Sequence, residues 1–145
     1  MADPSIADGS FVWTLFPFGP PHRPELPGPA RHIAYVLARN SRQRPAQALL
    51  AYTSSGPWRG ASPAPPVGVI EFSATEAKAL RQRPFHIDLR CLAQVPVTSA
   101  WFPDLEQPDH GVVAVAGTRH QVRIERAFEQ LVARNRHLIE MRGSR

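Results

Sequence analysis

Two short stretches of the sequence carry side chains that can bind and stabilise a phosphate group. Arg31 precedes the apolar run His32–Ala38, and Thr53 and Ser54 close a second apolar run that begins at Ala46. If the two runs pair as antiparallel strands, the start of the first lies beside the end of the second. A guanidinium holds phosphate through two parallel hydrogen bonds, and a hydroxyl can donate to another phosphate oxygen. The spacing therefore predicts a phosphate-binding site at this end of the strand pair.

Two more side chains near this point could contribute to binding or catalysis. His32 carries an imidazole, which can exchange protons near neutral pH. Trp58 follows Ser54 by four residues and offers a ring on which a nucleobase can stack. Each of these residues also has an ordinary interpretation: Arg31 as a surface arginine, His32 as a surface histidine, and Trp58 as a loop residue anchored on the core.

The positive charge of the chain is concentrated in one segment. The formal net charge is +5, and residues 19–60 alone account for it, with one acid, Glu25, and six arginines: Arg23, Arg31, Arg39, Arg42, Arg44 and Arg59. A localised basic face favours a polyanionic partner. We therefore predict that Arg42, Arg44 and Arg59 contact RNA. The alternative is compositional bias, because Lys78 is the only lysine among 17 basic residues.

Apolar patterning predicts a strand-rich α+β domain. The expected strands cover residues 11–18, 32–38, 46–53, 67–72 and 85–93, with a short further strand over 95–101, and residues 110–116 form an ambiguous apolar run. Within 85–93, alternation predicts that Phe85, Ile87, Leu89 and Cys91 share one face. Proline-rich loops are expected over 19–30 and 54–66.

Two helices are expected as well. Ser73 and Glu76 have the spacing of a capping box, which predicts a short helix to about residue 81. A long amphipathic helix is expected from Thr118 onwards, with apolar residues at helical spacing: Ile124, Phe128, Leu131, Leu138 and Met141.

Other features of the sequence argue against several classes of protein. Cys91 is the only cysteine, so no disulfide can form within the chain. No stretch approaches the roughly 20 apolar residues of a membrane span, and residues 1–9, expected to be a flexible tail, lack the basic residues of a signal peptide. We therefore expect a cytoplasmic protein without membrane association. Phosphate-loop, zinc and serine-hydrolase motifs are absent, so we predict neither a metal nor a cofactor.

Four segments match, in order, short motifs of one known family. They are Gly9–Phe16, Gly28–Ala38, Leu49–Ser54 and Asp88–Ala93, and the terminal helix follows them. Over roughly residues 9–140 the chain resembles the MazF/PemK family of toxin ribonucleases. The resemblance implies a single domain over residues 10–142, built as a small SH3-like antiparallel β-barrel with one short helix and a long C-terminal helix.

The resemblance also implies an activity and its residues. It implies a metal-independent, sequence-specific endoribonuclease that cleaves single-stranded RNA with the substrate's own 2′-hydroxyl. Such a protein acts as the toxin of a toxin–antitoxin pair, with a cognate antitoxin as partner and a homodimer as assembly. Arg31 matches the family's catalytic and phosphate-binding arginine, and Thr53 matches its active-site threonine, with Ser54 beside it. Asp88 and Arg90 fall in the strand where the family places an acid or amide and an arginine.

The sequence departs from the family pattern at two positions. The usual Arg-Pro pair is Arg31-His32 here, and Ser10 stands where an acid often follows the opening glycine. Two other functions stay open: a non-catalytic module that binds nucleic acid or protein with the same barrel, and a gyrase-directed toxin of the CcdB type.

Overall fold

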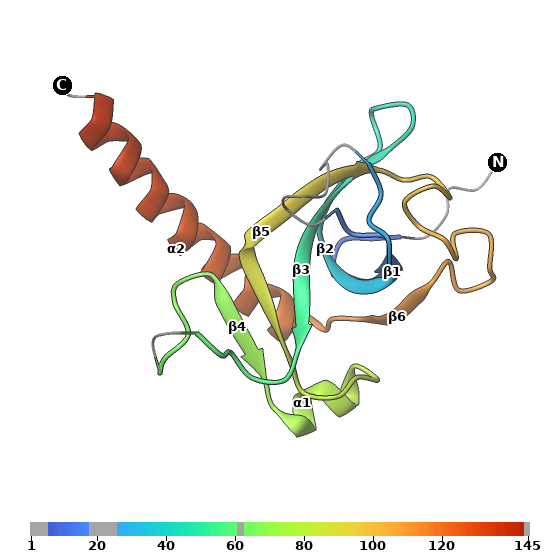
Figure 1. Cartoon of the computed structure of the whole chain (residues 1–145), viewed down its shortest axis with the longest axis horizontal. Coiled ribbons are helices and arrows are strands. Elements are labelled where there is room, and N and C mark those ends of the chain that lie inside the picture. Colours follow the sequence, from blue (N-terminus) through green and yellow to red (C-terminus); the bar gives the residue numbers. More distant parts are fainter. Residues whose placement is uncertain (1–5, 18–25, 61–62, 144–145) are drawn as a thin grey trace.

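A computed structural model describes residues 6–17, 26–60 and 63–143, with side chains as far as residue 135 (Figure 1). In chain order the elements are β1 (Ser10–Thr14), β2 (His32–Asn40), β3 (Gln47–Ser55), β4 (Val69–Phe72), α1 (Ala74–Ala79), β5 (Phe85–Pro96), β6 (Val112–Val115) and α2 (Thr118–Gly143). The six strands form one antiparallel sheet in the order β4-β5-β3-β2-β1-β6. The predicted α+β class, with a short helix and a long C-terminal helix, is confirmed.

The sheet is not closed into a barrel. β4 and β6 lie at its two edges, and within the described ranges these strands do not pair with each other. Buried side chains occupy both faces: the adjacent residues Phe11 and Val12 of β1 are both fully buried, but in different clusters. One cluster is covered by the loop after β5, through Trp101, Phe102 and Leu105. The other is covered by α1 and α2, through Ala77, Leu80 and Ile124. A sheet covered on both faces explains why the middle parts of β2 and β3 are continuously apolar.

The predicted meander of the first three strands is confirmed. Phe11 of β1 lies opposite Tyr35 of β2, and Ala34 of β2 lies opposite Tyr52 of β3. β1 ends at Thr14, earlier than expected, and the remaining predicted strand residue Phe18 lies outside the described residues together with 19–25. The ambiguous run 110–116 contains the edge strand β6.

A bulge in β5 overturns one prediction about the core. Tyr52 of β3 pairs with Asp88, whereas the preceding residue, Ala51, pairs with Leu92. Three residues of β5 therefore lie between two successive pairs, and the bulge breaks the alternation of faces. Phe85, Ile87 and Leu89 share the helix-covered cluster as predicted, but Cys91 packs against the opposite one.

The two helices begin near their predicted positions. The Ser73 hydroxyl accepts the Glu76 backbone N–H at 3.2 Å, and the Glu76 carboxylate accepts the Ser73 N–H at 3.0 Å, so the capping box is confirmed. α2 packs against the sheet through Ile124, Phe128 and Leu131, and its C-terminal part extends past the edge of the sheet (Figure 1). The side chains of Leu138 and Met141 lie outside those described.

Residues 6–9, which the sequence assigned to a flexible tail, are part of the packed domain. Ile6 is fully buried, the Asp8 carboxylate accepts the Arg39 backbone N–H at 2.8 Å, and the Gly9 N–H donates to the Val36 carbonyl at 2.8 Å. One buried apolar residue and two hydrogen bonds are sufficient reason for this segment to be ordered. No helix in the described part of the chain is long and apolar enough to cross a membrane.

Candidate functional site

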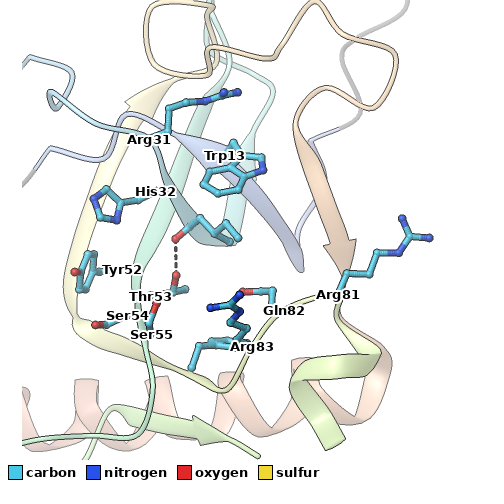
Figure 2. A pocket seen from close by; sticks show the side chains of 12 residues that line it. Trp13, Arg31, His32, Tyr52, Thr53, Ser54, Ser55, Arg81, Gln82 and Arg83 are labelled. Atoms are coloured by element: carbon cyan, nitrogen blue, oxygen red, sulfur yellow. Dashed lines mark hydrogen bonds between the residues drawn. The ribbon is translucent and has the colours of Figure 1, made fainter. Parts of the chain in front are cut away.

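The start of β2 and the end of β3 form one wall of a cavity of about 540 Å³ (Figure 2). Four segments far apart in the sequence line it: Trp13 at the end of β1, residues 31–33, residues 52–55, and the connection from α1 into β5 at 81–85. Arg31 and Thr53 both belong to this lining, but the Arg31 side chain extends away from the Thr53 hydroxyl in Figure 2. We call this the first cavity.

Thr53 is locked into the sheet beneath the cavity. Its side chain is only 7% exposed, and its hydroxyl donates to the Ile33 carbonyl at 2.5 Å, the bond drawn as a dashed line in Figure 2. This bond joins β3 to β2 where β2 begins. Because the hydroxyl proton is committed to a backbone carbonyl, Thr53 can offer a ligand only its remaining acceptor capacity unless the bond breaks. Tyr52, Ser54 and Ser55 supply the other hydroxyls of the first cavity.

Arg31 is held by a carboxylate and an aromatic ring. Its guanidinium forms an ion pair with Asp104, which belongs to the loop between β5 and β6. The same guanidinium lies over the Trp13 ring, with 5.7 Å between Cζ and the ring centroid. The Arg31 side chain is still 51% exposed. A phosphate can therefore reach it, but only in competition with Asp104.

The connection from α1 to β5 supplies two arginines that the sequence reasoning did not assign to the site. Arg83 extends toward the middle of the first cavity in Figure 2, and Arg81 extends to one side. No described residue forms an ion pair with either of them. Arg81 adopts a positive φ of 57°, a conformation that costs a non-glycine residue about 1 kcal/mol. The Arg83 guanidinium is therefore available to a phosphate. Arg81, two residues earlier, has a strained backbone conformation.

Aromatic rings complete the lining. Trp13 is 37% exposed, whereas its neighbours Phe11 and Val12 are fully buried, so its ring is the part of β1 that faces a ligand. Tyr52 and His32 lie on the other side of the first cavity, with ring centroids 6.1 Å apart. Exposed rings beside guanidinium groups are typical of surfaces on which single-stranded bases stack.

Trp58, predicted as the stacking residue, does not line the first cavity. Its ring is covered by the Arg90 guanidinium, 5.0 Å from the centroid, and meets the His86 ring edge-on at 6.0 Å. Its backbone N–H donates to the Glu71 carboxylate at 3.0 Å. These contacts fold the loop after β3 onto β4 and β5, so Trp58 anchors that loop, as its ordinary interpretation required. The neighbouring Arg59 is exposed and does not line the cavity either.

Asp88 and Arg90 also lie outside the lining of the first cavity, and they bind each other. The Arg90 Nε and Nη2 atoms donate to the two carboxylate oxygens of Asp88, each at 2.9 Å. Burial raises the pKa of Asp88, but the hydrogen bonds and charge of Arg90 outweigh burial and lower that pKa overall. Paired in this way, the two residues stabilise the bulged part of β5, and their assignment to RNA binding is not supported by their position.

Arg42 and Arg44 lie at the far end of the β2–β3 hairpin. Both are in the exposed turn that follows Asn40, whereas the first cavity lies where β2 begins. A strand of nine residues spans roughly 26 Å at about 3.3 Å per residue. The arginines of 19–60 are therefore divided between the two ends of the hairpin, and Arg23 lies outside the described residues. RNA binding by Arg42 and Arg44 stays a prediction that is separate from the first cavity.

No known protein family matches this sequence, and no curated protein is significantly similar to it. Among the described residues, no group of three or more His, Cys, Asp or Glu side chains lies close enough together to hold a metal ion. The chemical groups gathered in the first cavity are guanidinium groups, hydroxyls, one imidazole and aromatic rings.

Proposed function

We propose that this protein is a metal-independent endoribonuclease that cleaves single-stranded RNA in the first cavity. The observation that carries the proposal is the convergence of Arg31 and Arg83 with the exposed ring of Trp13 around one open space. Guanidinium groups bind the phosphodiester and aromatic rings hold the adjacent bases. Single-stranded RNA offers both phosphates and unstacked bases, whereas a duplex hides the faces of its bases.

The proposed reaction uses the 2′-hydroxyl of the substrate as nucleophile. Its oxygen forms a bond to phosphorus as the bond from phosphorus to the 5′-oxygen breaks, which leaves a 2′,3′-cyclic phosphate and a 5′-hydroxyl. The proton of the 2′-hydroxyl goes to a base, and a proton must reach the departing 5′-oxygen. His32 is the imidazole in the lining of the first cavity and can perform either transfer. Arg83 and Arg31 stabilise the charge that accumulates on the phosphate oxygens.

The wider assignment follows the sequence resemblance. We propose that the sheet is an opened relative of the SH3-like barrel, in which the loop between β5 and β6 covers one face and the helices cover the other. The proposal includes a toxin of the MazF/PemK type, with an antitoxin protein as its natural inhibitor and a homodimer as its assembly. The order of strands and the terminal helix support it.

One observation favours a second candidate, a module that binds RNA without cleaving it. Arg31 is already paired with Asp104, and the Thr53 hydroxyl is committed to the Ile33 carbonyl. Arg31 and Thr53, the two residues that match the family's catalytic pair, therefore already have partners that compete with a phosphate. A binding module needs only Arg83, Arg81 and the exposed rings.

Incubation with labelled single-stranded RNA in excess EDTA separates the two candidates. The nuclease should produce fragments ending in a 2′,3′-cyclic phosphate, and Arg83→Ala should lower the rate by about 10²-fold or more, as expected for loss of a donor to the transition-state charge. Arg42→Ala is the matched control, because Arg42 is an exposed arginine at the far end of the hairpin. RNA binding without cleavage would support the second candidate. Equal loss of cleavage in both variants would refute the assigned site.

A further inference from the structure

A second cavity, also of about 540 Å³, lies beside the first. Trp13 and Arg81 line both cavities, so the two are adjacent and the indole ring stands between them. The second cavity is otherwise formed by the loop before β6 and by β6 itself, and it contains Asp104, Gln107 and Asp109. The first cavity is lined by arginines, whereas the polar side chains that this loop contributes to the second cavity are two carboxylates and one amide.

We infer that the second cavity binds a guanine base of the strand whose phosphate lies in the first cavity. The inference rests on the proposed function, because it takes a nucleic-acid phosphate as the occupant of the first cavity. It goes further by naming the base and the carboxylate that selects it, Asp109.

Asp109 is the carboxylate available to a base. Asp104 is bound to Arg31, whereas the described donor to Asp109 is the backbone N–H of Gly111, which binds Oδ1 at 2.9 Å. That bond fixes the carboxylate and leaves Oδ2 without a donor in the described part of the chain. Gly111 makes the arrangement possible, because it has a φ of +78° and a Cβ there would come within 3.0 Å of the Asp104 Cβ.

The chemistry of a carboxylate selects guanine among the four bases. An ionised carboxylate only accepts hydrogen bonds, through two oxygens side by side. The Watson–Crick edge of guanine presents two adjacent donors, N1–H and the N2 amino group, whereas adenine and cytosine each pair one amino donor with an acceptor. Uracil presents a single N–H between two carbonyls. Only guanine therefore meets both carboxylate oxygens with donors.

The neighbouring groups exclude a basic peptide as the natural occupant of both cavities. A ligand that spans them must be anionic where it meets Arg31 and Arg83 and rich in donors where it meets Asp109. A lysine-rich or arginine-rich segment would be repelled by the first cavity. A guanine nucleotide carries a phosphate at one end and a donor edge at the other, with a flat face between them that can stack on Trp13.

The test uses fluorescence anisotropy with short oligodeoxynucleotides, which lack the 2′-hydroxyl and cannot be cleaved by the proposed reaction. Oligothymidine with one central guanine should bind about tenfold more tightly than the same oligomer with adenine or hypoxanthine there, since one bidentate contact discriminates by that order. Hypoxanthine keeps N1–H and lacks the amino group, so it isolates the second donor. Asp109→Asn should remove the preference, so that the guanine, adenine and hypoxanthine oligomers bind this variant with equal affinity.

Glu106→Gln is the matched control, because Glu106 is an exposed carboxylate of the same loop that lines neither cavity. Asp109→Asn keeps an oxygen that can accept the Gly111 N–H, so an unchanged urea midpoint should confirm that this variant is folded. Wild-type protein that binds the three oligomers equally, or binds none of them, overturns the inference, as does a guanine preference that survives in Asp109→Asn. Guanine preference without RNA cleavage supports the inference and refutes only the nuclease. RNA cleavage without guanine preference would support the nuclease and refute the guanine site.

Discussion

The carboxylate of Asp104, which lines the second cavity, forms an ion pair with the guanidinium of Arg31, which lines the first. The two residues are separated by 73 positions, and their contact places the loop between β5 and β6 directly over the start of β2. Arg31 also lies over the Trp13 ring. The loop thereby fixes the orientation of the Arg31 guanidinium. Its Asp104 carboxylate also competes with any phosphate for that guanidinium.

Removal of this competition should strengthen RNA binding. Asp104→Asn deletes one negative charge beside Arg31 and should raise the affinity for single-stranded RNA roughly fivefold, equivalent to about 1 kcal/mol for a partly exposed pair. The log–log salt dependence should steepen by about 0.7, the contribution of one further phosphate contact on a single strand. Titration at several salt concentrations measures both. Glu106→Gln changes the net charge by the same amount in the same loop. An equal gain in RNA affinity in that variant would show that the ion pair between Asp104 and Arg31 does not limit RNA binding.

The bond from Thr53 to Ile33 should matter more for stability than for catalysis. Thr53→Val keeps the shape of the side chain, removes the hydroxyl, and leaves the Ile33 carbonyl without this donor. We expect a loss of about 1 kcal/mol in the free energy of unfolding, measured by urea titration. RNA cleavage at matched folded concentration should fall less than in Arg83→Ala, since the hydroxyl is committed to the backbone. Ser41→Ala, at an exposed position of the β2–β3 turn outside the cavity lining, is the control; a loss of cleavage in Thr53→Val as large as that in Arg83→Ala would assign Thr53 a catalytic role.

Local pattern was sufficient for most of the fold. Alternating or continuous apolar runs located β1 to β5, and the spacing of Ser73 and Glu76 located α1, because these signals depend on residues close in the sequence. The separate strand expected over 95–101 is wrong, since β5 continues to Pro96 and residues 97–101 form bends and turns. The bulge that moves Cys91 to the opposite face was not predictable, since it depends on how β5 pairs with β3. The closed barrel was expected only by resemblance, whereas the described strands form an open sheet with β4 and β6 at its edges.

Only the part of the candidate site that lies on the β2–β3 hairpin was predictable from the sequence. Arg31 and Thr53 come together because antiparallel pairing requires it. Arg81 and Arg83 reach the same space because Ser55 of β3 pairs with Phe85 of β5, a contact across 30 positions. Trp13 had a usable signal, being the exposed residue in an otherwise buried strand, but that exposure is visible only once the neighbouring strands are in place. Trp58 was misjudged because nothing in its own segment reveals that Arg90 covers its ring.

The N-terminal half of α2 should stabilise the fold by packing on the core. Two apolar residues on its buried face should differ in how much they contribute to the free energy of unfolding. Ile124 is fully buried, so Ile124→Ala should lower the free energy of unfolding by about 2–5 kcal/mol. Phe128 is only partly buried beside it, so Phe128→Ala should cost about half of what a fully buried phenylalanine costs, roughly 2 kcal/mol. Urea titration compares both with Gln130→Ala at an exposed position. If Phe128→Ala costs more than Ile124→Ala, α2 buries its middle turns against something other than this sheet.

The pairing of Asp88 with Arg90 should make stability depend on acid pH. The pKa of Asp88 is lower in the folded chain than its ordinary value, because the hydrogen bonds and charge of Arg90 outweigh the opposing effect of burial. The folded state therefore favours the ionised carboxylate. Its contribution is fully present above the unfolded pKa of about 3.9 and is lost as the pH falls through the lowered folded value. Since Arg90 is 41% exposed, the contribution at pH 7 should be only about 0.5–1 kcal/mol.

Asp88→Asn should thus be less stable than wild type at pH 7 by that amount in urea titration, and the difference should shrink steadily below about pH 4. A deficit in Asp88→Asn that persists unchanged into acid would mean that packing of the side chain, and not its ionisation, stabilises β5.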